Sequence, residues 1–205
     1  MLFRSLVDRD NGVRSDTTLE KLGTLKPAFD RKFGSLTAGN SSPLTDGASA
    51  VLMMSEARAR SEGLRTLGRV RSYAFTALDP AGQLLMGPAY AVPLALDRAG
   101  VTMKDVGLME MHEAFAAQVL SNLRALESRD FATKELGRAA PVGHPPEDRI
   151  NVMGGSIAIG HPFAATGARV TTTLLNEMVR RDVELGLVTV CAAGGMGFAL
   201  VLERV

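Results

Sequence analysis

The sequence has 205 residues, enough for one large domain or for one and a half smaller ones. Hydrophobic residues make up 46% and charged residues 22%, which is usual for a globular protein. A net charge of +1 and the absence of tryptophan argue against nucleic-acid binding, because neither a basic surface nor an aromatic stacking platform is evident.

The first third of the chain is poor in regular structure. Residues 1–36 show no sustained periodicity and are interpreted as a loop or as the end of a preceding unit. Residues 48–54 form a short apolar run that predicts a buried strand. A helix follows, with Ser55 as its N-cap and Gly63 as its C-cap, and residues 68–76 predict a second strand.

The remaining two thirds alternate between helices and strands. In chain order we expect a helix at 90–99, a strand at 106–111, a helix at 113–127, a charged surface excursion at 128–150, a helix that ends near 180–181, and strands at 186–191 and 197–203. Pro93 is tolerated only in the first turn of its helix. This order predicts a layered α/β domain whose last strands are antiparallel.

Targeting and redox signals are weak. The single cysteine excludes an intrachain disulfide and fits a reducing compartment. The N-terminal apolar patch is too short for a signal peptide, and no apolar run reaches the roughly 18 residues that a membrane span needs. We therefore expect a cytoplasmic protein without a membrane span.

Cys191 is the first candidate for chemistry. It ends an apolar strand and opens a turn with three glycines, and strand ends in α/β sheets are where ligands usually bind. A lone cysteine in an apolar strand is more often an inert core residue, so both interpretations stand for Cys191 taken alone.

Two histidines lie in comparable places. His161 stands in a Gly-His-Pro loop that leads into a helix, where it suits a general base or an oxyanion donor; the alternative is a turn histidine satisfied by backbone. His112 follows a predicted strand, and the simplest role of the adjacent Glu113 is capping the helix that begins there. His144 is interpreted as a surface residue.

Other common sites are not indicated. Three histidines and one cysteine give no zinc-ligand spacing, so no metal site is expected. The glycine clusters match neither a Walker loop nor the dinucleotide fingerprint. From the residues alone, a cysteine hydrolase with Cys191 as nucleophile and His161 as its base remains open.

Five motifs, in order over nearly the whole chain, resemble the thiolase family. They are Thr37-Ala38-Gly39-Asn40-Ser41-Ser42 with Asp46-Gly47, Leu85-Met86-Gly87-Pro88, His112-Glu113-Ala114-Phe115, Asn151 to Gly167, and Cys191 to Gly197. Most thiolases have Asn where this chain has His112. That variant and the long 128–150 segment are more similar to the β-subunit of the fatty-acid oxidation trifunctional complex.

The resemblance implies a role for each candidate. His161 would activate a nucleophilic cysteine and help bind the thioester oxygen. Cys191 would be the acid/base, with a thiol pKa tuned near neutrality, and His112 would serve one oxyanion hole, where its titration would add pH dependence. The backbone N–H near Ala193 would serve the second oxyanion hole. Ser42 and Phe115 match positions that line the coenzyme A tunnel.

The resemblance also implies a fold and a reaction. We expect a thiolase C-terminal domain over 68–205, built on a five-stranded mixed sheet with helices on both faces, and the tail of the N-terminal domain with its loop region over 1–67. The implied reaction is thiolytic cleavage of 3-ketoacyl-CoA to acetyl-CoA and a shortened acyl-CoA, or the reverse condensation, in fatty-acid β-oxidation. Coenzyme A would be a co-substrate, and no bound cofactor is expected.

No residue here matches the family's nucleophilic cysteine, which belongs to its N-terminal half. We therefore expect little activity from the chain alone. An alternative is a non-catalytic module that completes a split thiolase or assembles with a hydratase/dehydrogenase subunit. Acyl chain length, the direction of the reaction and the oligomeric state do not follow from the sequence.

Overall fold

The computed structural model describes residue 6 and residues 8–205, and what the sequence suggests for residues 1–5 and 7 lies outside the described residues. A four-stranded mixed sheet has the order β1-β4-β3-β2. Its strands are β1 (Gly68–Ala77), β2 (Leu108–Met111), β3 (Leu185–Ala192) and β4 (Met196–Arg204). The last two strands form an antiparallel hairpin, as predicted, while β2 runs parallel to β3 and β1 antiparallel to β4.

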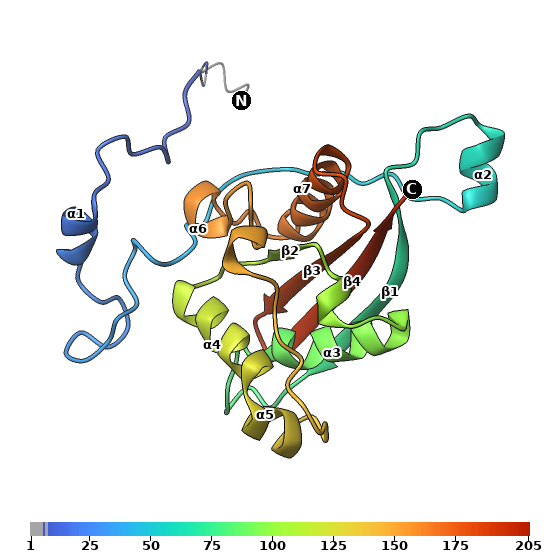
Figure 1. Cartoon of the computed structure of the whole chain (residues 1–205). Coiled ribbons are helices and arrows are strands. Elements are labelled where there is room, and N and C mark those ends of the chain that lie inside the picture. The colour runs from blue at the N-terminus through green and yellow to red at the C-terminus, as the bar shows by residue number, and fades with distance from the viewer. Residues whose placement is uncertain (1–5, 7) are drawn as a thin grey trace.

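Helices cover both faces of this sheet (Figure 1). One face packs against α3 (Gly87–Ala99) and α4 (Ala116–Glu127), and the other packs against α7 (Thr166–Arg180). The two cores separate because neighbouring strand residues point to opposite faces. Leu187 lies in the core beneath α3, and the next residue, Val188, lies in the core beneath α7.

Four short helices and two 3₁₀ turns complete the part of the chain that the structure describes. The helices are α1 (Leu19–Gly23), α2 (Glu56–Ser61), α5 (Arg129–Lys134) and α6 (Ser156–Ile159), and the turns are Met103–Asp105 and Glu147–Arg149. The 128–150 segment therefore contains its own helix. Helix α5 is held to α3 by an edge-on contact of the Phe131 and Tyr90 rings, whose centroids are 5.1 Å apart.

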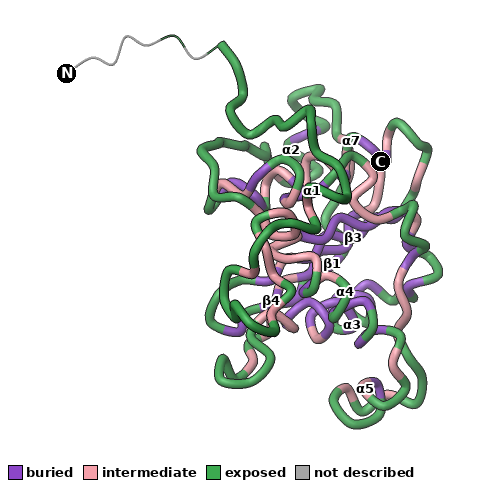
Figure 2. Tube along the Cα trace, turned by 90° about the vertical axis from the view of Figure 1, so that its left-hand side faces the viewer, coloured by how far each residue is buried: buried purple, intermediate pink, exposed green. Residues whose placement is uncertain are grey.

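The strand predicted at 48–54 is not formed. Residues 48–54 have no regular secondary structure and pair with no strand among the described residues, and Leu52 and Met53 are 80% and 71% exposed. A strand needs a neighbour for its backbone hydrogen bonds, and the sheet does not reach this segment. Figure 2 shows the described part of the first 60 residues mostly exposed, outside the buried strands.

Two helix predictions need correction. The first predicted helix after β1 begins at Gly87 rather than at residue 90, so Pro88 occupies its first turn and Pro93 lies inside it. The helix predicted from residue 113 begins only at Ala116. The residues before it, including His112 and Glu113, instead form the connection between β2 and α4.

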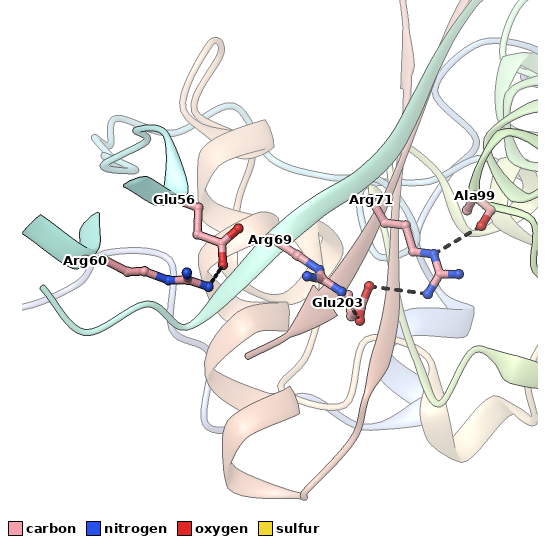
Figure 3. Close-up of polar contacts among 6 residues, drawn as sticks. All are labelled: Glu56, Arg60, Arg69, Arg71, Ala99 and Glu203. Atoms are coloured by element: carbon pink, nitrogen blue, oxygen red, sulfur yellow. Dashed lines mark hydrogen bonds and ion pairs between the residues drawn. The ribbon is translucent and has the colours of Figure 1, made fainter. Parts of the chain in front are cut away.

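A small ionic cluster fastens the outer strand (Figure 3). Glu203 on β4 accepts hydrogen bonds from Arg69 at 2.6 Å and from Arg71 at 3.3 Å, both on β1. The Nε of Arg71 also donates to the carbonyl of Ala99, at the end of α3, at 3.1 Å. Arg69 lowers the pKa of Glu203. The cluster links three elements, although exposed ion pairs of this kind contribute at most about 1 kcal/mol each.

Candidate active site

The carboxyl ends of the parallel strands β2 and β3 bring the first two candidates to one edge of the sheet. The last paired residues are Met111 and Thr189, and the backbone N–H of His112 donates to the Thr189 carbonyl at 2.9 Å. Cys191 follows two residues after Thr189. His112 is 2% exposed and Cys191 is 4% exposed, so both are buried at this edge.

His161 joins this edge from the loop after α6. Its ring is tilted 37° against that of His112, and the ring centroids are 4.1 Å apart. The loop is held by the backbone N–H of His161, which donates to the Pro43 carbonyl at 2.9 Å. The Gly-His-Pro motif and the segment after Thr37 are therefore joined directly, although more than a hundred residues separate them in the sequence.

The segment around Ser42 also contacts the start of α4. The Ser42 N–H donates to the Ala114 carbonyl at 3.0 Å, and the N–H of Ala116 donates to the Asn40 carbonyl at 2.9 Å. Ser41 and Phe115 form an isolated β-bridge. Ser42 and Phe115, proposed from the sequence as coenzyme A contacts, consequently lie within one residue of the same bridge, and both are half-buried.

The turn after Cys191 depends on glycine. Gly194 and Gly195 have φ angles of +86° and +79°, which residues with a side chain rarely adopt. At the base of the turn, a Cβ on Gly197 would lie 2.3 Å from the backbone of Gly87, the first residue of α3. The Leu85-Met86-Gly87-Pro88 motif is thus packed against the Cys191 to Gly197 motif. Ala193 lies exposed in the turn between β3 and β4.

Burial sets the charge state of the two histidines. Burial, followed by His161 and the positive charge of Arg169, lowers the pKa of His112 to about 4. Burial, followed by Arg169, also lowers the pKa of His161. Both rings are therefore neutral at pH 7, and the expected pH dependence from titration of His112 near neutrality is wrong.

Burial acts on Cys191 in the opposite direction from the expectation. It raises the pKa of the thiol to about 11, against a smaller lowering by the backbone N–H groups of Cys191 and Ala114. The sequence suggested a thiol tuned near neutrality. In the structure, Cys191 is a protonated thiol at pH 7, with only about one molecule in 10⁴ as the thiolate.

Polar side chains that sequence reasoning overlooked support the histidines. Nδ1 of His112 lies 2.9 Å from the Ser156 hydroxyl, which also accepts a hydrogen bond from Nη2 of Arg169 at 3.0 Å. Nδ1 of His161 lies 2.7 Å from the Thr166 hydroxyl. Ser156 and Thr166 fall inside the Asn151–Gly167 motif, so this motif is the sequence feature that could have indicated them. No feature of the sequence singled out Arg169.

Glu113 has a different role from the predicted one. Its carboxylate accepts from Nδ2 of Asn151 at 2.6 Å and from the N–H of Ile157 at 3.1 Å, rather than capping α4. Asn151 in turn pairs with the backbone of Met111 at the end of β2. Glu113 therefore ties the glycine-rich loop and the start of α6 to the strand that carries His112.

Further features bound the site's chemistry. Among the described residues, no group of three or more His, Cys, Asp or Glu side chains is arranged to hold a metal ion. The same residues include no helix of the length and hydropathy needed for a membrane span.

His144 is more enclosed than predicted, since its Nε2 lies 3.1 Å from Glu127 and its side chain is 14% exposed. A cavity of about 350 Å³ lies elsewhere, between α3 and residues 135–138, and none of the candidate residues lines it.

Comparison with known proteins shows which family the chain belongs to. The family model of the thiolase C-terminal domain matches residues 64–204, and that of the thiolase N-terminal domain matches residues 3–57. The chain belongs to the thiolase family. This membership confirms the resemblance and the thiolase-like α/β fold, with four strands in place of the expected five.

Individual thiolases match nearly the whole chain. It is 57% identical over 201 residues to a 3-ketoacyl-CoA thiolase of Serratia proteamaculans and 56% identical to one of Yersinia enterocolitica, covering 98% of this chain and 46% of each relative. Among solved structures, it is similar to the Bacillus anthracis acetyl-CoA acetyltransferase, with a TM-score of 0.81, 38% identity and coverage of 96% of this chain and 45% of that one.

A human relative was solved with coenzyme A. The human mitochondrial 3-ketoacyl-CoA thiolase in complex with CoA matches with a TM-score of 0.79 and 33% identity, covering 96% of this chain and 45% of that chain. The chain thus spans less than half the length of these thiolases.

Proposed function

We propose that this chain supplies the acid/base and oxyanion groups for thiolytic cleavage of a 3-ketoacyl-CoA, or for the reverse condensation. The observation that carries the proposal is the convergence of His161, His112 and the Cys191 turn at one edge of the sheet. The 3-ketoacyl-CoA thiolases that match 98% of the chain support it.

The chemistry assigned to His161 needs a ring nitrogen without a proton. The Thr166 hydroxyl can donate to the Pro162 carbonyl, 3.3 Å away, while it accepts from Nδ1–H of His161. Nε2 of His161 is then free to take the proton of a nucleophilic thiol. In the thiolase reaction that thiol attacks the 3-keto carbon, and the bond between C2 and C3 breaks with its electron pair left on C2.

Cys191 suits the next step because it is protonated. Its thiol donates a proton to C2, which releases acetyl-CoA, and the resulting thiolate accepts the proton of the incoming coenzyme A thiol. The coenzyme A sulfur then attacks the acyl-enzyme thioester and releases the shortened acyl-CoA. A thiol pKa of about 11 disfavours the alternative of Cys191 as the nucleophile of a hydrolase, because that role needs a thiolate.

Hydrogen-bond donors for the developing oxyanions come from the same edge. We assign His112 and His161 to one oxyanion site and the backbone N–H of Ala193 to the other. Ser42 and Phe115 are assigned to the coenzyme A binding surface, at the β-bridge between Ser41 and Phe115. Fatty-acid β-oxidation is the proposed pathway, and location in the cytoplasm stays a prediction from the sequence.

The 205 residues hold one cysteine, and the reaction above uses two. We therefore propose that this polypeptide catalyses thiolysis only when a thiolase N-terminal half supplies the nucleophile. The proposed boundary lies at residues 67 and 68. The exposed apolar residues Leu52 and Met53 support the proposal of such a partner, because they lie in the part of the chain matched by the N-terminal family model.

The test is a thiolysis assay with acetoacetyl-CoA and coenzyme A. The chain is measured alone and after co-expression with the N-terminal half of the Serratia relative, with Cys191→Ala in this chain as the matched control. We expect activity only in the mixture and its loss with Cys191→Ala. Turnover by the chain alone at the rate of a full-length thiolase would refute the need for a second half.

The second candidate is a non-catalytic assembly module. The exposed apolar run at Leu52 and Met53 favours binding to another polypeptide independently of catalysis. Stable co-purification with the thiolase half or with a hydratase/dehydrogenase subunit, without thiolysis in any mixture, would select this function over the first.

A further inference from the structure

We propose that Ser156 and Arg169 are positioning residues that hold His112 with its proton on Nε2, so that it presents a neutral hydrogen-bond donor. Its importance for catalysis rests on the proposed function, whereas the proton position does not. The proposal concerns two residues outside the reacting set, Ser156 on α6 and Arg169 on α7.

The argument begins with Arg169, whose guanidinium can only donate hydrogen bonds. Its Nη2 lies 3.0 Å from Oγ of Ser156, so this oxygen accepts. The Ser156 side chain is fully buried, and its hydroxyl proton therefore needs an acceptor within the protein. Nδ1 of His112, at 2.9 Å, is the one remaining hydrogen-bond partner of this hydroxyl among the described residues.

Two proton arrangements are possible for that contact. If the Ser156 hydroxyl donates, Nδ1 of His112 carries no proton and the neutral ring holds its proton on Nε2. If Nδ1–H donates instead, the serine proton is left buried without an acceptor, which is costly. The first arrangement gives both the Nη2 donor of Arg169 and the hydroxyl donor of Ser156 an acceptor, and we infer that it is the one present.

The surroundings keep the ring neutral. The titratable groups around His112 are His161, against its ring, Arg169, on α7, Glu113, the next residue in the chain, and the Cys191 thiol at the same edge of the sheet. Burial and the positive charge of Arg169 both disfavour the imidazolium. Arg169 thus has two effects on His112: through Ser156 it orients the proton, and through its charge it resists a second one.

The two stacked histidines then differ in proton position. Nδ1 of His161 faces a threonine hydroxyl that has the Pro162 carbonyl as a second partner, whereas Nδ1 of His112 faces a serine hydroxyl that already accepts from Arg169. Under the proposed function, the first arrangement leaves a base at Nε2 and the second leaves a donor at Nε2. One ring can take the nucleophile's proton while its neighbour binds the oxyanion.

The experiment is nitrogen NMR of the chain with ¹⁵N-labelled histidine, without substrate or partner. The sequence has three histidines, so variants at His144 and His161 assign the signals. At pH 7 we expect His112 to show a protonated Nε2 and a bare Nδ1 whose shift is displaced by a hydrogen bond. A proton on Nδ1 of His112 in the unsubstituted chain would overturn the proposal, and this measurement needs no variant to fold.

Two variants separate the contributions. In Ser156→Ala we expect the Nδ1 signal of His112 to move to the value of an unbonded ring nitrogen. In Arg169→Met we expect the pKa of His112 to rise. Ser72→Ala is the matched control, because Ser72 is also a buried serine but bonds the Ala95 carbonyl on α3.

An unchanged Nδ1 signal in folded Ser156→Ala, or the same displacement in Ser72→Ala, would also overturn the proposal. Because this readout involves no turnover, it can succeed when the thiolysis assay fails. The proposed function would then fall while the assignment of the proton stands.

Discussion

Substituting Gly155 by alanine tests how the glycine-rich loop is held beneath His112. Gly155 has extended backbone angles, φ −120° and ψ −170°, so alanine adds no backbone strain. Its Cβ, however, would lie 2.0 to 2.2 Å from the carboxylate atoms of Glu113. The carboxylate must move, and it then loses its hydrogen bonds from Asn151 and Ile157.

The size of the effect follows from those two bonds. A hydrogen bond to a charged group contributes about 1.5 to 3 kcal/mol, and the half-buried Glu113 regains some solvation when displaced. We expect Gly155→Ala to lower the free energy of unfolding by about 2 to 4 kcal/mol. Urea denaturation followed by circular dichroism measures this value, provided that the slope m is unchanged.

Gly167→Ala is the matched control. Gly167 lies in the first turn of α7 and a Cβ there would meet nothing within 4 Å. Since alanine is the better helix former, this variant should be as stable as the unsubstituted chain or more stable by up to about 1 kcal/mol. If Gly155→Ala behaves like Gly167→Ala, the proposed role of Glu113 in holding the loop is wrong.

Three further predictions concern burial. Replacing Leu174, which is on the buried face of α7 and 1% exposed, by alanine should lower the free energy of unfolding by about 2 to 5 kcal/mol. Leu120→Ala, at an exposed site of α4, should change it by less than about 1 kcal/mol in the same urea assay. The thiol of Cys191, with a pKa of about 11 against an ordinary 9.0, should react with iodoacetamide at pH 8 about 100-fold more slowly than in the urea-unfolded chain; equal rates would contradict its burial. Burial raises the pKa of Glu110 from 4.5 to about 8, so the folded chain keeps a proton that the unfolded chain releases, and stability should fall as pH rises through this window. Glu110→Gln should lose less stability over the same pH range, and parallel curves would refute the protonated state.

The sequence located most of the sheet because its local signals agree with the tertiary fold. The strands predicted at 68–76, 186–191 and 197–203 match β1, β3 and β4 to within one residue at each end. These runs have hydrophobic faces and glycine-containing boundaries that leave few alternatives. Residues 48–54 have a similar apolar composition but no neighbouring strand, and composition alone does not supply one.

The sequence motifs pointed to candidate site residues but not to their protonation. The motifs identified His112, His161 and Cys191, and the structure places both histidines side by side. Their charge states depend on enclosure by distant segments, which no local pattern encodes. Arg169 illustrates the difference, because an arginine in a helix is ordinarily solvent-facing, and only the packing of α7 beside Ser156 gives it a contact with the site.

The close approach of Gly87 and Gly197 has a consequence for how the cysteine turn can move. The base of the turn is pressed against the first residue of α3, and Gly195 is held by the N–H of Leu78, which donates to its carbonyl at 2.8 Å. We therefore expect any movement of the turn to be greatest at its tip, at residues 193–194, while its base stays fixed against α3.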